Sequence, residues 1–192
     1  MSNAIVFIVT TLVNLYIITF ILRIMFQLQR VDYRNPVVQF IATVTNPLVL
    51  PLRRIIPSAG KVDSASVVAA VGLKLAEVAL LTILLCSVVP PIPQLVGITL
   101  ISLVRMLLNF YFFVILASVI LSWVSAGGYN PAAAVIAQLA EPVLGPFRKL
   151  IPPIGGFDIT PIFAIIAIQA LMMLLPVSVY AGLQCASAIQ ML

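Results

Sequence analysis

One stretch of this chain occurs twice, and the repetition limits the folds that the sequence can adopt. Residues 35–63 and 130–158 share many prolines, glycines and charged residues at one constant offset of 95, the distance from Asn35 to Asn130. The matched pairs are Asn35/Asn130, Pro36/Pro131, Pro47/Pro142, Pro51/Pro146, Arg53/Arg148, Ile56/Ile151, Pro57/Pro152, Gly60/Gly155 and Asp63/Asp158. Because the chain has 192 residues, each half is one copy of a tandem repeat.

The composition places this repeat in a membrane. Hydrophobic residues make up 63% of the chain and charged residues 8%, whereas a soluble domain has roughly 25% charged residues. The mean hydropathy is +1.25. We therefore expect a polytopic membrane protein, with the lipid bilayer as its first partner.

The apolar runs predict an all-α membrane protein with four transmembrane helices, arranged as two tandem parallel two-helix repeats. Each run is long enough for the roughly 20 residues that cross a bilayer. Each repeat also contains a short amphipathic helix at the cytoplasmic interface. The predicted ranges are residues 1–95 for repeat 1 (spans 4–28 and 64–89, interfacial helix 36–46) and residues 96–192 for repeat 2 (spans 96–124 and 159–180, interfacial helix 131–141).

The distribution of charge predicts the orientation. The net charge is +5, and basic residues gather in the two repeated loops, as Arg30, Arg34, Arg53, Arg54, Lys61, Arg148 and Lys149. Cytoplasmic loops carry such an excess of Lys and Arg. We therefore expect a multi-pass protein of the bacterial inner membrane with periplasmic N- and C-termini, and no nucleic acid as a direct ligand.

Local signals divide each repeated loop into parts. An asparagine followed by proline, at Asn35 with Pro36 and at Asn130 with Pro131, is typical of a helix start. We expect Pro47 and Pro51, with their counterparts, to break the chain soon afterwards. The motif P-x-x-G-x-x-D then predicts a turn that ends on a helix-capping aspartate; its residues are Pro57, Gly60, Asp63, Pro152, Gly155 and Asp158. A role of the two aspartates as cation ligands or as a docking surface is the alternative.

Three ionisable residues interrupt the predicted spans. Lys74, Glu77 and Arg105 are candidates for function because charges inside a membrane are costly. Counting about 1.5 Å per residue along each helix places all three near the midplane. We expect one network, which either fixes helix register or forms part of an ion or proton path. Asn14 and Asn109 are expected to hydrogen-bond between the halves, and Arg23 to extend toward the headgroups.

The basic pairs of the repeated loops are the candidate surface. Arg53 with Arg54, and Arg148 with Lys149, occupy the same place in both copies. Basic residues at a cytoplasmic interface attract anionic lipids, each by about 1 kcal/mol. Anionic-lipid contact is the first interpretation, and an unknown protein partner or a second copy of the chain is the alternative.

The sequence contains no recognisable catalytic set. It has no histidine, two cysteines and five acidic residues, which argues against acid–base, thiol and ordinary zinc chemistry. We therefore expect a protein that is not an enzyme, with no catalytic, cofactor-binding or metal-binding residues.

The doubled motif N-P…P-x-x-x-P-x-R-[RK]-x-I-P-x-x-G-x-x-D, between apolar segments, resembles the YggT (YlmG) family of bacterial and chloroplast membrane proteins. The resemblance covers nearly the whole chain. For bacterial members it implies a role in osmotic or salt-stress tolerance and cation homeostasis, with ion transport as one mechanism. For plastid members it implies cytochrome b6 haem attachment or nucleoid organisation. The alternative function is a membrane scaffold or assembly factor that recruits partners or senses lipid through its basic amphipathic loops.

Overall fold

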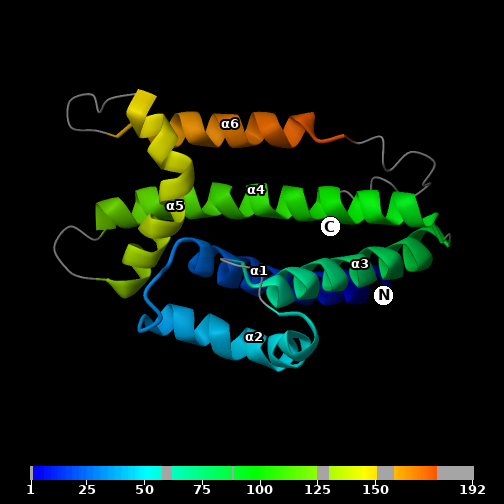
Figure 1. The fold of residues 1–192 in the computed structure, drawn as a ribbon. Helices are drawn as coiled ribbons and strands as arrows, with labels where there is room; N and C mark the ends of the chain where they lie inside the picture. Colours follow the sequence, from blue (N-terminus) through cyan, green and yellow to red (C-terminus); the bar gives the residue numbers. More distant parts are fainter. Residues whose placement is uncertain (1, 58–61, 88, 125–129, 151–157, 177–192) are drawn as a thin grey trace.

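The computed structural model describes residues 2–57, 62–87, 89–124, 130–150 and 158–176, and most of these residues lie in helices. Figure 1 shows the arrangement of the six helices. In chain order they are α1 (Ser2–Leu28), α2 (Pro36–Ile55), α3 (Ser64–Cys86), α4 (Ile92–Val124), α5 (Pro131–Leu150) and α6 (Thr160–Leu174).

Three of these helices are long and apolar enough to cross a membrane. They are α1 over Ala4–Leu28, α3 over Ser64–Cys86 and α4 over Ile92–Ser122. The apolar helix α6 is shorter, with 15 residues, and the part of the fourth predicted span beyond residue 176 lies outside the described residues. In Figure 1, α1, α3, α4 and α6 run along one common direction. The regular structure of the described residues is therefore all helical, with apolar helices that indicate a membrane protein.

Helices α2 and α5 have equal lengths of 20 residues and begin at Pro36 and Pro131. The break predicted at Pro47 and Pro51 is wrong, because α2 continues through both prolines to Ile55. Helix α5 likewise contains Pro142 and Pro146. A proline removes one intrahelical hydrogen bond and crowds one carbonyl, which bends a helix but does not have to end it when one face is packed. Figure 1 shows this curvature in α5, which lies across α4 and α6 near one end of both.

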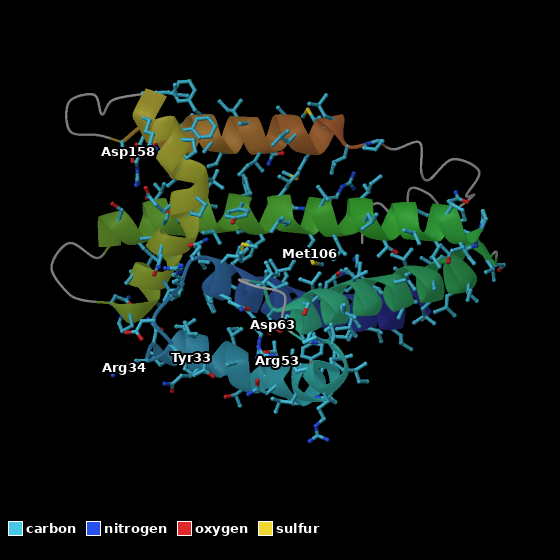
Figure 2. All side chains as sticks on the ribbon, viewed as in Figure 1. Tyr33, Arg34, Arg53, Asp63, Met106 and Asp158 are labelled. Atoms are coloured by element: carbon cyan, nitrogen blue, oxygen red, sulfur yellow. The ribbon has the colours of Figure 1, made fainter. Side chains whose placement is uncertain are left out.

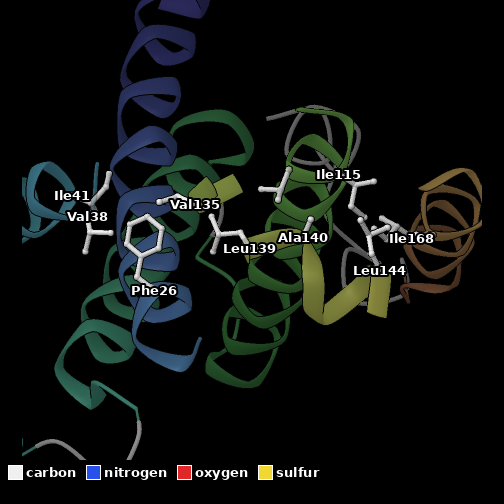
Figure 3. Close-up of a cluster of buried hydrophobic side chains, with 11 residues drawn as sticks. Phe26, Val38, Ile41, Ile115, Val135, Leu139, Ala140, Leu144 and Ile168 are labelled. Carbon is white, nitrogen blue, oxygen red and sulfur yellow. The ribbon is translucent and has the colours of Figure 1, made fainter. Parts of the chain in front are cut away.

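The main apolar core joins the two halves of the chain. Figure 3 shows Phe26 of α1 and Ile41 of α2 in the same cluster as Leu139 of α5 and Ile168 of α6. A second cluster, around Ile17, Phe20 and Ala69, holds α1 against α3. Helix α1 therefore contributes to both cores, and the amphipathic helices α2 and α5 pack their apolar faces inward.

Candidate functional site

A carboxylate that is fully shielded from solvent lies at the start of α3. The side chain of Asp63 is 0% exposed and accepts hydrogen bonds from Arg53 Nη2 at 2.5 Å, Arg53 Nε at 3.2 Å and Ser66 Oγ at 2.8 Å. Arg23 Nε adds a third ion-pair contact at 3.3 Å. Figure 2 shows Arg53 beside Asp63. The predicted capping bond of Asp63 is absent from the described hydrogen bonds of α3, since these partners engage its oxygens.

Arg23 connects α1 to α2 within the same cluster. Its Nη1 donates to Thr45 Oγ1 at 2.5 Å, to Asn46 Oδ1 at 2.9 Å and to the Ala42 carbonyl at 3.3 Å. Its side chain is 13% exposed, so Arg23 is held by α2 and Asp63, and these protein contacts were not part of its interpretation as a residue extended toward the headgroups. We name Arg23, Thr45, Asn46, Arg53, Asp63 and Ser66 the Asp63 cluster.

The pKa of Asp63 is lowered by its partners. Burial by itself would raise that pKa, but hydrogen bonds from Arg53 and Ser66, with the charges of Arg53 and Arg23, outweigh burial. The hydrogen bond to Asp63 in turn raises the pKa of Arg53. Asp63 is therefore ionised at neutral pH, and two guanidinium groups around one carboxylate give the cluster a net charge of +1.

The second half contains a related arrangement with the opposite balance of charges. We name Glu141, Arg148, Asp158 and Thr160 the Asp158 cluster. Arg148 pairs with Asp158 at 3.0 Å and with Glu141 at 2.6 Å. These three side chains are 46%, 41% and 58% exposed, in that order. Two carboxylates around one guanidinium give a net charge of −1. The repeat therefore preserves a pair of arginine and aspartate while the sign of the surrounding charge changes.

Asp158 also holds the start of α6. Its Oδ1 accepts from the Thr160 backbone N–H at 2.9 Å and from the Thr160 hydroxyl. Burial by itself would raise the pKa of Asp158. The bonds from Thr160 and the pair with Arg148 outweigh burial, so the pKa of Asp158 is lowered. In Figure 2, Asp158 lies far from Asp63, so the two clusters are separate sites.

The predicted basic surface contains residues that pair with aspartates and residues that are exposed. Arg53 and Arg148 each pair with the aspartate ten positions later in the chain. Arg54 and Lys149 are exposed, and the hydrogen bonds and ion pairs of the described residues do not include either. An arginine ten positions before an aspartate occurs in both copies, so this spacing could have revealed the pairs. The role of Arg23 had no such signal, since Ser118 occupies its equivalent position.

The predicted helix starts lie at the contact between the halves. Asn35 Oδ1 accepts from Val37 N at 2.9 Å, while its Nδ2 donates to the Pro131 carbonyl at 3.0 Å. Asn130 Oδ1 accepts from Ala132 N at 2.9 Å. Asn35 therefore caps α2 and also links it to α5. Of the predicted turn residues, Pro57 follows α2, whereas Gly60, Pro152 and Gly155 lie outside the described residues.

Two residues of the predicted intramembrane network, Lys74 and Glu77, lie in contact. Lys74 Nζ lies 3.0 Å from Glu77 Oε2 and 2.8 Å from Asn14 Oδ1, and Asn14 Nδ2 donates to Glu77 Oε1 at 3.0 Å. Lys74 and Glu77 are 6% and 5% exposed. These contacts therefore confirm the Lys74 and Glu77 part of the network, and the place of Arg105 in it stays a prediction. Asn14 of α1 therefore bridges the two charges of α3.

Comparison with known proteins identifies the family. A family model described as CCB3/YggT matches residues 2–84 and again residues 97–179. The chain is 43% identical over 175 residues to the protein PA0392 of Pseudomonas aeruginosa, covering 91% of this chain and 89% of that protein. It is 36% identical over 171 residues to YggT of Escherichia coli K12, covering 89% and 88%. A chloroplastic YlmG homolog protein 2 of Arabidopsis thaliana is 35% identical over 65 residues, which is 33% of this chain and 25% of that protein.

No solved structure matches the chain. The two stretches matched by the family model, together with relatives that cover most of the chain, confirm the resemblance seen in the doubled motif. The chain belongs to the CCB3/YggT family.

Proposed function

We propose that the chain is a multi-pass protein of the bacterial inner membrane, with four spans arranged as two parallel repeats. Helices α2 and α5 support this proposal because both have 20 residues and start 95 positions apart, at Pro36 and Pro131. The double match of the family model has the same spacing, from residue 2 to residue 97. Helix α6 and the residues after it would form the fourth span.

The proposed orientation places α2 and α5 in the cytoplasm and both termini in the periplasm. The basic ends of α2 and α5 support it, since each helix has two basic residues in its last turn and cytoplasmic loops carry an excess of Lys and Arg.

Within this topology we propose a non-enzymatic scaffold that presents a pair of basic sites to a cytoplasmic partner. The observation that carries the proposal is that the two residues of each basic pair have different surroundings. Arg53 and Arg148 hold their own turns through aspartates, while Arg54 and Lys149 remain exposed on the adjacent position of each helix. Such a scaffold would support osmotic or salt-stress tolerance through the proteins that it assembles.

Neutralising Arg54 and Lys149 together tests the scaffold. We expect the variant Arg54→Gln with Lys149→Gln to fold normally, because both side chains are exposed and exposed substitutions change stability by about 0.5 kcal/mol or less. The partner that cross-links to the wild-type protein in native membranes should be lost, together with growth at high salt. The control is Gln39→Ala, an exposed and uncharged change on α2. Full cross-linking and growth of the double variant would contradict the proposal.

A second candidate function, cation transport, is favoured by the buried Lys74, Glu77 and Asn14 network. Ionisable residues inside membrane proteins often mark ion or proton pathways. If this network conducts, the variant Glu77→Gln should abolish cation flux through the purified protein in liposomes. Thr82→Ser is the control, since Thr82 is also buried in α3 and its hydrogen bonds within the described part of the chain go to its own helix, at Val78 and Ala79. Unchanged flux in a folded Glu77→Gln protein would remove transport as a function.

A further inference from the structure

The Asp63 cluster forms one wall of a cleft between α1, α2 and the connection that follows α1. The cleft has a volume of about 490 Å³, within the range of roughly 300–1,000 Å³ that is typical of sites for organic ligands. Its polar lining consists of Arg23, Gln27, Tyr33, Asn46 and Arg53. No acidic side chain is among the described residues that line it, because Asp63 lies behind the arginines with 0% exposure.

Both arginines retain hydrogen-bonding capacity after they bind Asp63. Arg53 uses Nε and Nη2 for the carboxylate, and Arg23 uses Nε for Asp63 and Nη1 for groups of α2. Arg53 Nη1 and Arg23 Nη2 have no hydrogen-bond partner among the residues that the structure describes. Two guanidinium groups with unused donors and a net positive charge suit an anionic oxygen group such as a phosphate.

The other wall of the cleft is apolar, which favours an amphiphile over a free anion. Phe26, Ile41 and Leu50 line it, and the cleft lies at the end of the apolar stretch Ala4–Leu28 of α1. A helix end of this kind lies at the level of the lipid headgroups. We propose that the cleft is a specific site for one anionic phospholipid, with its phosphate at Arg23 and Arg53 and its acyl carbons against the apolar wall.

The equivalent place in the second half lacks these features. Ser118 stands where Arg23 is in the first half, and Glu141 stands where Asn46 is. Arg148, the counterpart of Arg53, is occupied by two carboxylates. The proposed site therefore belongs to the first half alone, and one lipid per chain is expected.

Native mass spectrometry of the detergent-purified protein with added phosphatidylglycerol tests the inference, which rests on the membrane location proposed above. We expect one bound phosphatidylglycerol per chain and weaker binding of phosphatidylcholine with the same acyl chains. The variant Arg53→Gln should weaken phosphatidylglycerol binding about tenfold, the effect of losing one charge-assisted hydrogen bond. Arg54→Gln removes the same charge one position along, outside the cleft, and should change binding less than about twofold.

A second variant covers the case in which Arg53→Gln does not fold. Gln27→Trp fills the cleft without touching Asp63, so it should also displace the lipid while the thermal unfolding midpoint stays close to that of the wild type. Equal binding of the two lipids, equal effects of Arg53→Gln and Arg54→Gln, or retained lipid in folded Gln27→Trp would each overturn the inference. Competition by millimolar inorganic phosphate would also overturn it in favour of a soluble anion. None of these results would test the proposed scaffold function, because binding of its partner depends on Arg54 and Lys149.

Discussion

Replacing Asp63 by asparagine is expected to lower the free energy of unfolding by about 3–5 kcal/mol, the effect of breaking a buried ion pair by removing one partner. The carboxylate is 0% exposed and joins Arg23 of α1, Arg53 of α2 and Ser66 of α3. Without its charge, Arg23 would remain 13% exposed with no anion beside it. The loss should appear as a lower midpoint of denaturant-induced unfolding in detergent micelles.

The second repeat provides the matched control for this substitution. Asp158→Asn is the same chemical change at the equivalent position, but Asp158 is 41% exposed and its partner Arg148 is 46% exposed. Exposed ion pairs contribute about 0–1 kcal/mol, so Asp158→Asn should be nearly neutral. Equal losses from the two substitutions would show that burial does not set the strength of the Asp63 cluster.

The pH dependence of stability gives an independent measurement on the same pair. The pKa of Asp63 is lowered in the folded protein, so its stabilising contribution is present above the unfolded pKa of about 3.9 and is lost as the pH falls through the folded pKa. The difference between wild type and Asp63→Asn should therefore be full at pH 7 and shrink below about pH 4. A difference that is constant from pH 7 to pH 3 would contradict this assignment.

The sequence predicted the elements of this fold better than the contacts between them. Hydropathy located the spans of α1, α3 and α4, and the dipeptides at Asn35 and Asn130 marked the starts of α2 and α5. Proline patterns failed because a packed amphipathic helix tolerates Pro47 and Pro51. The strength of tertiary packing that keeps such a helix continuous is not visible in local sequence.

The charged groups show a second limit of sequence reasoning. Helical rise gives the depth of a residue in the membrane, but the rotation of each helix about its axis decides which residues meet. Depth alone grouped Lys74, Glu77 and Arg105, but it did not reveal that Asn14 of α1 bonds to both Lys74 and Glu77. The same limit hid Arg23, whose partners on α2 become neighbours only when α1 and α2 pack together.

Replacing Lys74 by methionine is the second change for which we expect a large effect, a loss of about 3–5 kcal/mol. Glu77 would then be a buried carboxylate, 5% exposed, without the ammonium group that lies 3.0 Å away. Adding Glu77→Gln to Lys74→Met should recover most of this loss, because an amide is neutral and can still hydrogen-bond to Asn14. The measurement is unfolding in micelles of the two single variants and the double variant, analysed as a double-mutant cycle.

The repeat again offers a control, since Gln169 of α6 occupies the position equivalent to Lys74. Gln169 is exposed, so Gln169→Met should change stability by about 0.5 kcal/mol or less. A double variant as unstable as Lys74→Met alone would show that the two charges are not coupled. A stable double variant that grows normally at high salt would assign the network to helix packing between α1 and α3. If the stable double variant instead loses cation flux, the charges themselves are required, and transport becomes the function that the network serves.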